Sequence, residues 1–119
     1  MNNFKKLLIG ATVLLGTSAA NAAVTCNGTT QCQGPAAEIM VSLFPSPTGG
    51  ILISSPSVVN GLPCTGASGG NNVLLPATHV NYNQTYATLL TASVAEKEVI
   101  LRIDTAQAAC TLFFARMIN

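Results

Sequence analysis

Apolar and polar residues alternate along several short stretches of the chain, which is the pattern of half-buried β-strands. In residues 39–44, Ile39, Val41 and Leu43 fall on one face, so this stretch is expected to be a strand. The turn-forming cluster PSPTGG follows, and ILISS resumes the pattern, which predicts a β-hairpin. Further short strands are expected at residues 57–60 and in NNVLLPATHV, where Pro76 ends the strand.

The stretch NQTYATLLTASVAEKEVILRID, residues 83–104, changes period without a proline or a glycine. Its first part has the spacing of an amphipathic helix, with Asn83 as the expected N-cap. The predicted inward face consists of Tyr86, Leu89, Leu90, Ser93 and Val94. From Glu98 onward the period is two, which predicts a strand to residue 104, and ACTLFFARMI is expected to pair with it across TAQA.

The order of elements is therefore strand, strand, short strand, helix, strand and strand. One helix on a small antiparallel sheet predicts the α+β class, either as a plain sheet or as a partly open OB-like barrel of about five strands with one helix. We also expect Phe44, Phe113 and Phe114 to lie in the core, because they fall in strand-like runs.

The N-terminus has the three zones of a bacterial secretory signal peptide. Lys5 and Lys6 precede an apolar run from Leu7 to Leu15, and Ala20-Asn21-Ala22 fits the cleavage rule. The run is too short to cross a membrane as a helix, and no other stretch reaches the roughly 20 residues that a span needs. We therefore expect a signal peptide at residues 1–22 and a single secreted or periplasmic domain at residues 23–119.

Four cysteines remain after the expected cleavage, an even number that favours two disulfide bonds in an exported chain. Three pairings are open from the sequence. The favoured one joins Cys26 to Cys32 around an irregular arm, TCNGTTQCQGP, and joins Cys64 to Cys110. A zinc site is the alternative, but the chain has one histidine and no C-x-x-C pair. No metal and no cofactor are expected.

The expected mature chain carries three positive and four negative side chains, a net charge of −1 with His79 neutral. This charge excludes nucleic-acid binding, which needs several lysines or arginines, and a polybasic membrane patch. The remaining surface is rich in serine, threonine, asparagine, glutamine and glycine. Such a surface suits a neutral ligand such as a sugar, or another protein chain. The alternative is that the low charge has no link to ligand binding, since exported bacterial proteins are often low in charge.

The chain offers few groups for catalysis. His79 is its only histidine, and no motif singles out a serine that could join His79 and Asp104 in a triad. We therefore expect no catalytic residues and no enzymatic activity. Tyr82, at the start of the helix, is the one candidate for ligand binding, because its ring could stack on a sugar. The alternative, a tyrosine packed at the helix entry, is the stronger one.

The segments YATLLTASVAEKEVILRID and AACTLFF, which cover the last third of the chain, resemble small secreted OB-fold domains of the AB5 toxin B-subunit type, as in subtilase-cytotoxin and pertussis-like toxins. This family commonly carries a glycine after the helix, where this chain has Glu96-Lys97. The resemblance implies a homo-oligomer, a pentameric ring that binds cell-surface glycans. The alternative is a structural or inhibitor-like exported protein that binds a protein partner.

Overall fold

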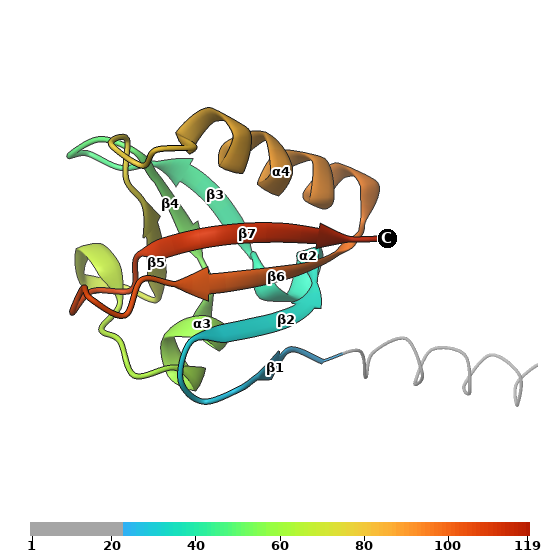
Figure 1. The fold of residues 1–119 in the computed structure, drawn as a ribbon, viewed down its shortest axis with the longest axis horizontal. Helices are drawn as coiled ribbons and strands as arrows, with labels where there is room; N and C mark the ends of the chain where they lie inside the picture. Colours follow the sequence, from blue (N-terminus) through green and yellow to red (C-terminus); the bar gives the residue numbers. More distant parts are fainter. Residues whose placement is uncertain (1–22) are drawn as a thin grey trace, which may run out of the picture.

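A computed structural model describes residues 23–119, so the predicted signal peptide lies outside the described part. Two antiparallel sheets form the fold, with sheet B behind sheet A in Figure 1. Sheet A has the order β1-β2-β6-β7, with bounds Thr25–Cys26, Gln31–Pro35, Glu98–Ile103 and Leu112–Ile118. Sheet B has the order β3-β4-β5, with bounds Ser42–Pro45, Ile51–Ser54 and Asn72–Leu75.

Within residues 23–119, the helical segments are α2 (Ala36–Ile39), α3 (Pro56–Gly61), α4 (Tyr82–Ala95) and a 3-10 turn, η1 (Ala67–Gly69). The predicted α+β class is confirmed, and the sheets do not close into a barrel. The described chain has more strands and helices than the five and one expected from the sequence, because short elements replace stretches predicted as loop or strand.

The core lies between the two sheets and under the helices. Along β6 the side chains of Val99, Leu101 and Ile103 are buried and alternate with exposed or half-buried neighbours, which confirms the predicted strand. β6 pairs with β7, and β3 pairs with β4, so both predicted hairpins are present. The largest fully buried side chains come from both sheets and two helices: Ile39, Leu52, Ile53, Leu75, Leu89, Leu101 and Leu112.

The prediction of an irregular N-terminal arm is wrong, because residues 25–35 form the β1–β2 hairpin and β2 pairs with β6. At its turn the side-chain oxygen of Asn27 accepts hydrogen bonds from the backbone N–H groups of Thr29, Thr30 and Gln31. Gly34 has no side chain, which lets the chain at Val24 cross close to it. Turn-forming residues therefore close a hairpin here instead of leaving the arm outside the sheet.

The predicted strand over residues 39–44 is only half right. Residues 36–39 form α2, directly after Pro35, and its Ile39 enters the core with no exposed surface. β3 begins at Ser42, and Val41, placed by the alternation on the apolar face, is 63% exposed. Pro35 ends β2 and is the N-cap residue of α2, whose single turn is closed by the Met40 N–H donating to the Ala36 carbonyl at 2.9 Å.

The short strand predicted at residues 57–60 is also wrong, since these residues lie in α3. Pro56 stands in its first turn, which favours a helix, and Val58 is fully buried. Gly61 ends this helix against the first disulfide: a Cβ atom there would lie 2.6 Å from the Cys26 sulfur. Helix α3 and the β1–β2 hairpin are therefore packed in direct contact.

Helix α4 is present, but it starts at Tyr82 with Asn81 as its N-cap residue rather than Asn83. Its buried face is rotated from the predicted one and consists of Thr85, Leu89 and Ala92. Two residues of the predicted face, Leu90 and Val94, are 41% and 84% exposed. Small side chains at positions 85 and 92 allow the helix to pack beside β7, whereas a face built on leucine and valine would hold it further away.

The joint between α4 and β6 contains Glu96 in the left-handed conformation, with φ of 55°. Glycine is the usual residue at this position of a helix end. The N–H of Lys97 donates to the carbonyl of Ala92 at 3.0 Å, which completes the turn. The chain thus makes the glycine-type turn with Glu96-Lys97, the pair that departs from the B-subunit pattern.

Candidate binding face

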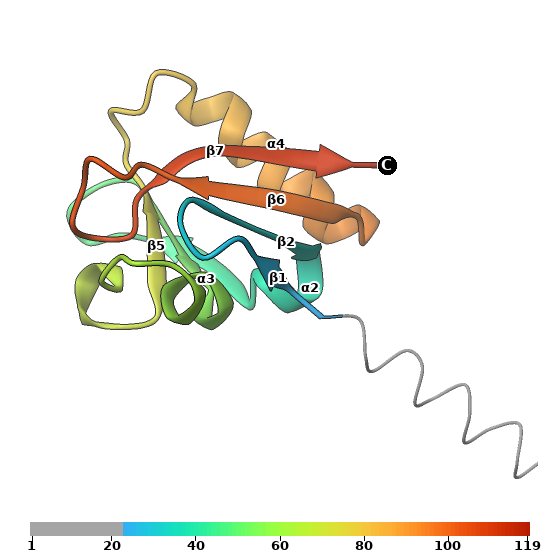
Figure 2. The same cartoon turned by 60° about the horizontal axis from the view of Figure 1, so that its bottom comes forward.

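The outward side chains of β2, β6 and β7 form a regular array on sheet A, which we call the outer face. Strand register places them in three rows across the sheet. Within residues 23–119 no helix lies over this face, because the helices lie behind the sheet or beyond its edge (Figures 1 and 2). The rows are Gln31, Arg102 and Phe114; Gln33, Ile100 and Arg116; and Pro35, Glu98 and Ile118.

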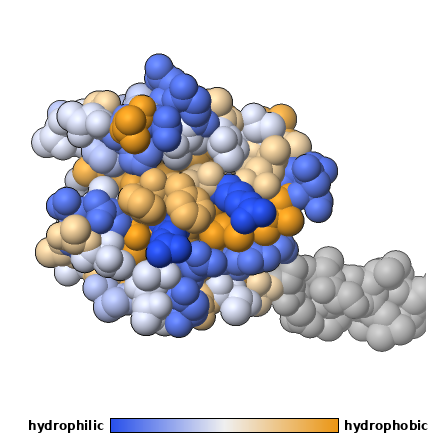
Figure 3. All heavy atoms as spheres, viewed as in Figure 1, coloured by the Kyte–Doolittle hydropathy of each residue, from blue (hydrophilic) through white to orange (hydrophobic). Residues whose placement is uncertain are grey.

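The outer face combines an apolar centre with charged and amide groups. Both arginines of the chain stand on it, on neighbouring strands. The Arg102 guanidinium lies 5.9 Å from the centre of the Phe114 ring, within range of a cation–π interaction. Figure 3 shows the result, an apolar patch over β6 and β7 that is interrupted by strongly hydrophilic side chains. A surface of this kind offers hydrogen-bond donors next to half-exposed rings and alkyl groups.

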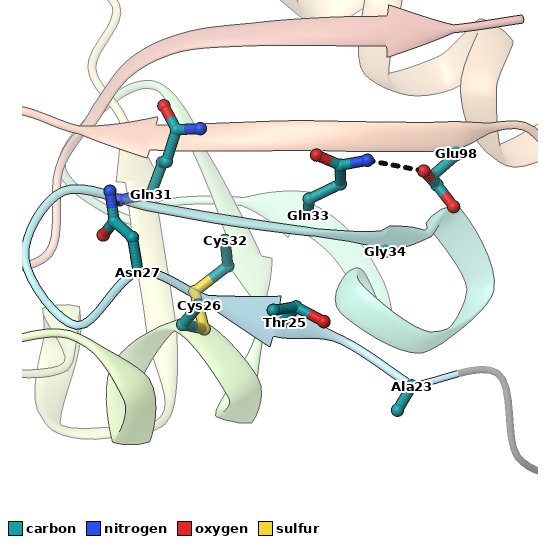
Figure 4. A pocket seen from close by; sticks show the side chains of 9 residues that line it. All are labelled: Ala23, Thr25, Cys26, Asn27, Gln31, Cys32, Gln33, Gly34 and Glu98. Carbon is teal, nitrogen blue, oxygen red and sulfur yellow. Dashed lines mark hydrogen bonds between the residues drawn. A yellow bond between two sulfur atoms is a disulfide. The ribbon is translucent and has the colours of Figure 1, made fainter.

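A groove of about 430 Å³ adjoins the outer face along β1 and β2 (Figure 4). Its polar lining comes from Thr25, Asn27, Gln31, Gln33 and Glu98, and it also includes Ala23, Gly34 and the disulfide of Cys26 and Cys32. Gln33 Nε2 donates to Glu98 Oε1 at 2.7 Å across the β2–β6 pair. This hydrogen bond fixes the orientation of the Gln33 amide, whose oxygen makes no hydrogen bond within residues 23–119.

The disulfides hold the groove and the neighbouring loops in place. Both pairings favoured from the sequence, Cys26–Cys32 and Cys64–Cys110, are present, which uses all four cysteines. The first joins β1 to β2 at the groove, and the second ties the loop after α3 to the segment before β7. No group of three potential metal ligands occurs in residues 23–119. Two disulfides fit an extracellular or periplasmic protein.

The His79 side chain links the loop after β5 to the start of β7 through hydrogen bonds. Its Nδ1 accepts a hydrogen bond from the backbone N–H of Asn81 at 3.0 Å, so the proton is on Nε2, which donates to the Phe113 carbonyl at 2.8 Å. Asp104 Oδ1 accepts from the N–H of Ala106 at 3.0 Å. Both ring nitrogens of His79 are therefore occupied by backbone groups, an arrangement that leaves neither nitrogen to activate a nucleophile.

Tyr82 lies on α4, half-buried against the core, and lines neither the groove nor the outer face. Its ring stacks on Tyr86, with the centroids 6.4 Å apart and the planes at 28°. This placement favours the packed alternative, and its role in ligand binding stays a prediction.

The prediction that the three phenylalanines are core residues is wrong, since Phe44 is 38% and Phe113 is 54% exposed and Phe114 lies outside the core cluster. Phe114 is half-buried on the outer face. Sequence reasoning missed the outer face because it treated residues 25–35 as an irregular arm. The alternation of Gln31 and Gln33 about the buried Cys32 is the signal that could have revealed it.

Comparisons with known proteins place the chain in no family. No family model matches it, and no curated protein or solved structure matches it significantly. The resemblance to AB5 toxin B subunits therefore stays a prediction. Among residues 23–119, no helix has the length and apolar character needed to cross a membrane.

Proposed function

We propose that this protein is an exported, non-enzymatic binding domain whose outer face and adjoining groove bind a glycan. The observation that carries the proposal is the array of amide, guanidinium and aromatic groups on a sheet face over which no described helix lies. The groove adds Thr25 and Asn27 to this array. The geometry gives one continuous surface with several hydrogen-bonding groups and little net charge.

The chemistry of these groups matches that of a sugar. An amide such as that of Gln31 or Gln33 both donates and accepts, so it pairs with sugar hydroxyls that do the same. Phe114 offers apolar area for the C–H side of a sugar ring. The Cys26–Cys32 bond and the Gln33–Glu98 hydrogen bond hold the groove before a ligand arrives, which lowers the entropy lost on binding.

A glycan array tests the proposal, followed by measurement of the dissociation constant for the best glycan. We expect saturable binding, and the double variant Gln31→Ala/Gln33→Ala should weaken it about tenfold or more, because each lost hydrogen bond contributes about 0.5–1.5 kcal/mol. The matched control removes two amides elsewhere, Gln84→Ala/Gln107→Ala; Gln84 is exposed on α4 and Gln107 lies in the loop before β7. A flat array, or equal loss in both double variants, would contradict the proposal.

The B-subunit resemblance adds a proposal on assembly, a homo-oligomeric ring of five chains. Light scattering after size-exclusion chromatography measures the molar mass directly. We expect a mass near five protomers if the ring forms. A clean monomer at micromolar concentration rejects the ring while leaving glycan binding by a single chain open to the array test.

A protein partner is the second candidate ligand, and one observation favours it. Edge strand β3 and the residue before it expose apolar side chains, Val41 and Phe44, which are 63% and 38% accessible. Exposed apolar groups on a sheet edge are typical of protein contacts. This candidate requires a monomer that co-purifies with one specific protein, and loss of that protein in Val41→Ser.

A further inference from the structure

A second cleft, of about 470 Å³, lies at another part of the molecule and shares no residue with the groove. It opens between the loop after β5, the loop after β6 and the start of β7. Its lining includes Pro76, His79, Val80, Asp104 and Phe113. Its volume is within the range of small-molecule sites in proteins, which is roughly 300–1,000 Å³.

The walls of this cleft are fixed by covalent and hydrogen bonds. His79 ties one wall to β7, as described above. Leu74 N–H donates to the Cys110 carbonyl at 2.9 Å, which joins sheet B to the segment that enters β7. Cys110 itself is held by the disulfide to Cys64. The cleft is therefore formed without a ligand, which is the usual condition of a small-molecule site.

The rim of the cleft is apolar and unusually accessible. Val80 is 89% exposed and Phe113 is 54% exposed. Pro76, Leu74 and Leu112 continue the apolar lining inward. An apolar ligand body would bury these rim side chains, which are costly to leave in water, and each buried CH₂ contributes about 0.8 kcal/mol.

One charge stands in the cleft, the carboxylate of Asp104. Its backbone is held by the N–H donation to the Thr111 carbonyl at 2.7 Å, and its Oδ1 accepts from Ala106. Its Oδ2 has no hydrogen-bond partner within the described residues 23–119. No lysine or arginine lines the cleft, so the lining is complementary to a positive charge.

We propose that this cleft binds a small organic cation, an ammonium group on an apolar or aromatic body. The ammonium donates to the free oxygen of Asp104, and the body packs between Val80, Pro76 and Phe113. This site shares no lining residue with the groove, and its rim adjoins the outer face only where the Phe113 ring lies 6.0 Å from the Phe114 ring. The proposal does not depend on glycan binding at the outer face. A neutral compound of the same shape gains the apolar contacts alone, and an anion meets repulsion from Asp104.

The test uses ¹⁵N-labelled protein and three probes of similar shape: 2-phenylethylammonium, 2-phenylethanol and 3-phenylpropanoate. We expect saturable amide shifts with the cation at Val80, Asp104 and Phe113. Binding of the neutral alcohol should be about tenfold weaker, because a charge-assisted hydrogen bond is lost. Equal affinity for cation and alcohol, shifts located elsewhere, or no saturation at millimolar cation would overturn the proposal.

Two variants sharpen the test. Asp104→Asn should remove the preference for the cation, and retention of that preference would overturn the assignment of the charge. Val80→Ser should weaken the binding of both cation and alcohol. Its matched control is Val94→Ser, since Val94 is also largely exposed but lies on α4 outside the cleft. If Asp104→Asn does not fold, the comparison of Val80→Ser with Val94→Ser and the affinities of the three probes still test whether the cleft binds the cation.

Discussion

Loss of the Cys64–Cys110 disulfide is expected to destabilise the protein by about 4 kcal/mol, the larger effect of its two disulfides. The bond closes a loop between residues 46 apart in sequence, and the chain-entropy model relates stabilisation to the size of that loop. The Cys26–Cys32 bond spans a separation of 6, for which the same model gives about 2.2 kcal/mol. Urea unfolding of the two double alanine variants measures both values.

The comparison is matched because each pair includes one fully buried cysteine, Cys110 or Cys32, so the packing lost on substitution is similar. The expected order therefore follows from loop size. A smaller loss for the 64–110 pair than for the 26–32 pair would contradict this account. In that case the β1–β2 hairpin, and not the long loop, would be the segment that most needs covalent closure.

Leu89→Ala is expected to lower the free energy of unfolding by about 3 kcal/mol, within the 2–5 kcal/mol typical of buried leucines. Leu89 has no exposed surface and belongs to the main core cluster between α4 and the sheets. Truncation leaves a cavity that the surrounding strands fill only in part. Thermal or urea unfolding, with the folded spectrum as a check, measures the loss.

The neighbouring leucine provides the control, since the sequence pattern assigned both to the same face. Leu90 is 41% exposed, so Leu90→Ala should change the stability by less than about 1 kcal/mol. Equal losses at the two positions would show that the helix face predicted from the sequence, with Leu90 and Val94 inward, is the correct one. The pair therefore tests the rotation of α4 directly.

The rotated face shows why sequence pattern predicts an element better than its orientation. Apolar residues of α4 occur all round the helix, so a spacing of three and four selects more than one plausible face. The structure buries Thr85 and Ala92, two small residues, because the helix packs close beside β7. This proximity depends on residues far along the chain, which the local spacing does not contain.

Strands with strict alternation were predictable, whereas short segments after prolines were not. β6 alternates over its whole length, and its pairing with β7 follows from the short connection. Residues 36–39 and 56–61 also contain apolar residues, but both segments are helical, and Pro56 in the first turn of α3 favours a helix there. Four to six residues are too few to distinguish a period of two from a period of 3.6.

The candidate site was the least predictable part. Its side chains come from β2, β6 and β7, and it is strand register that brings Gln33, Ile100 and Arg116 into one row. The composition predicted an uncharged polar surface that would bind a sugar or a protein. The one residue proposed for ligand binding, Tyr82, was expected at the start of the helix, outside the strands that form the outer face. The cysteine count predicted two disulfides, but it left three pairings open; the structure contains the favoured one.

The central claim, that the outer face and its groove bind a glycan, is tested most directly by amide shift mapping with the best glycan from the array. The account predicts that the largest shifts fall on β2 and its neighbours, at Thr25, Gln31, Gln33 and Arg102. Shifts centred on Tyr82 and α4, or on the cleft at Val80, would contradict it. Absence of saturable shifts with every glycan that the array selects would contradict it equally.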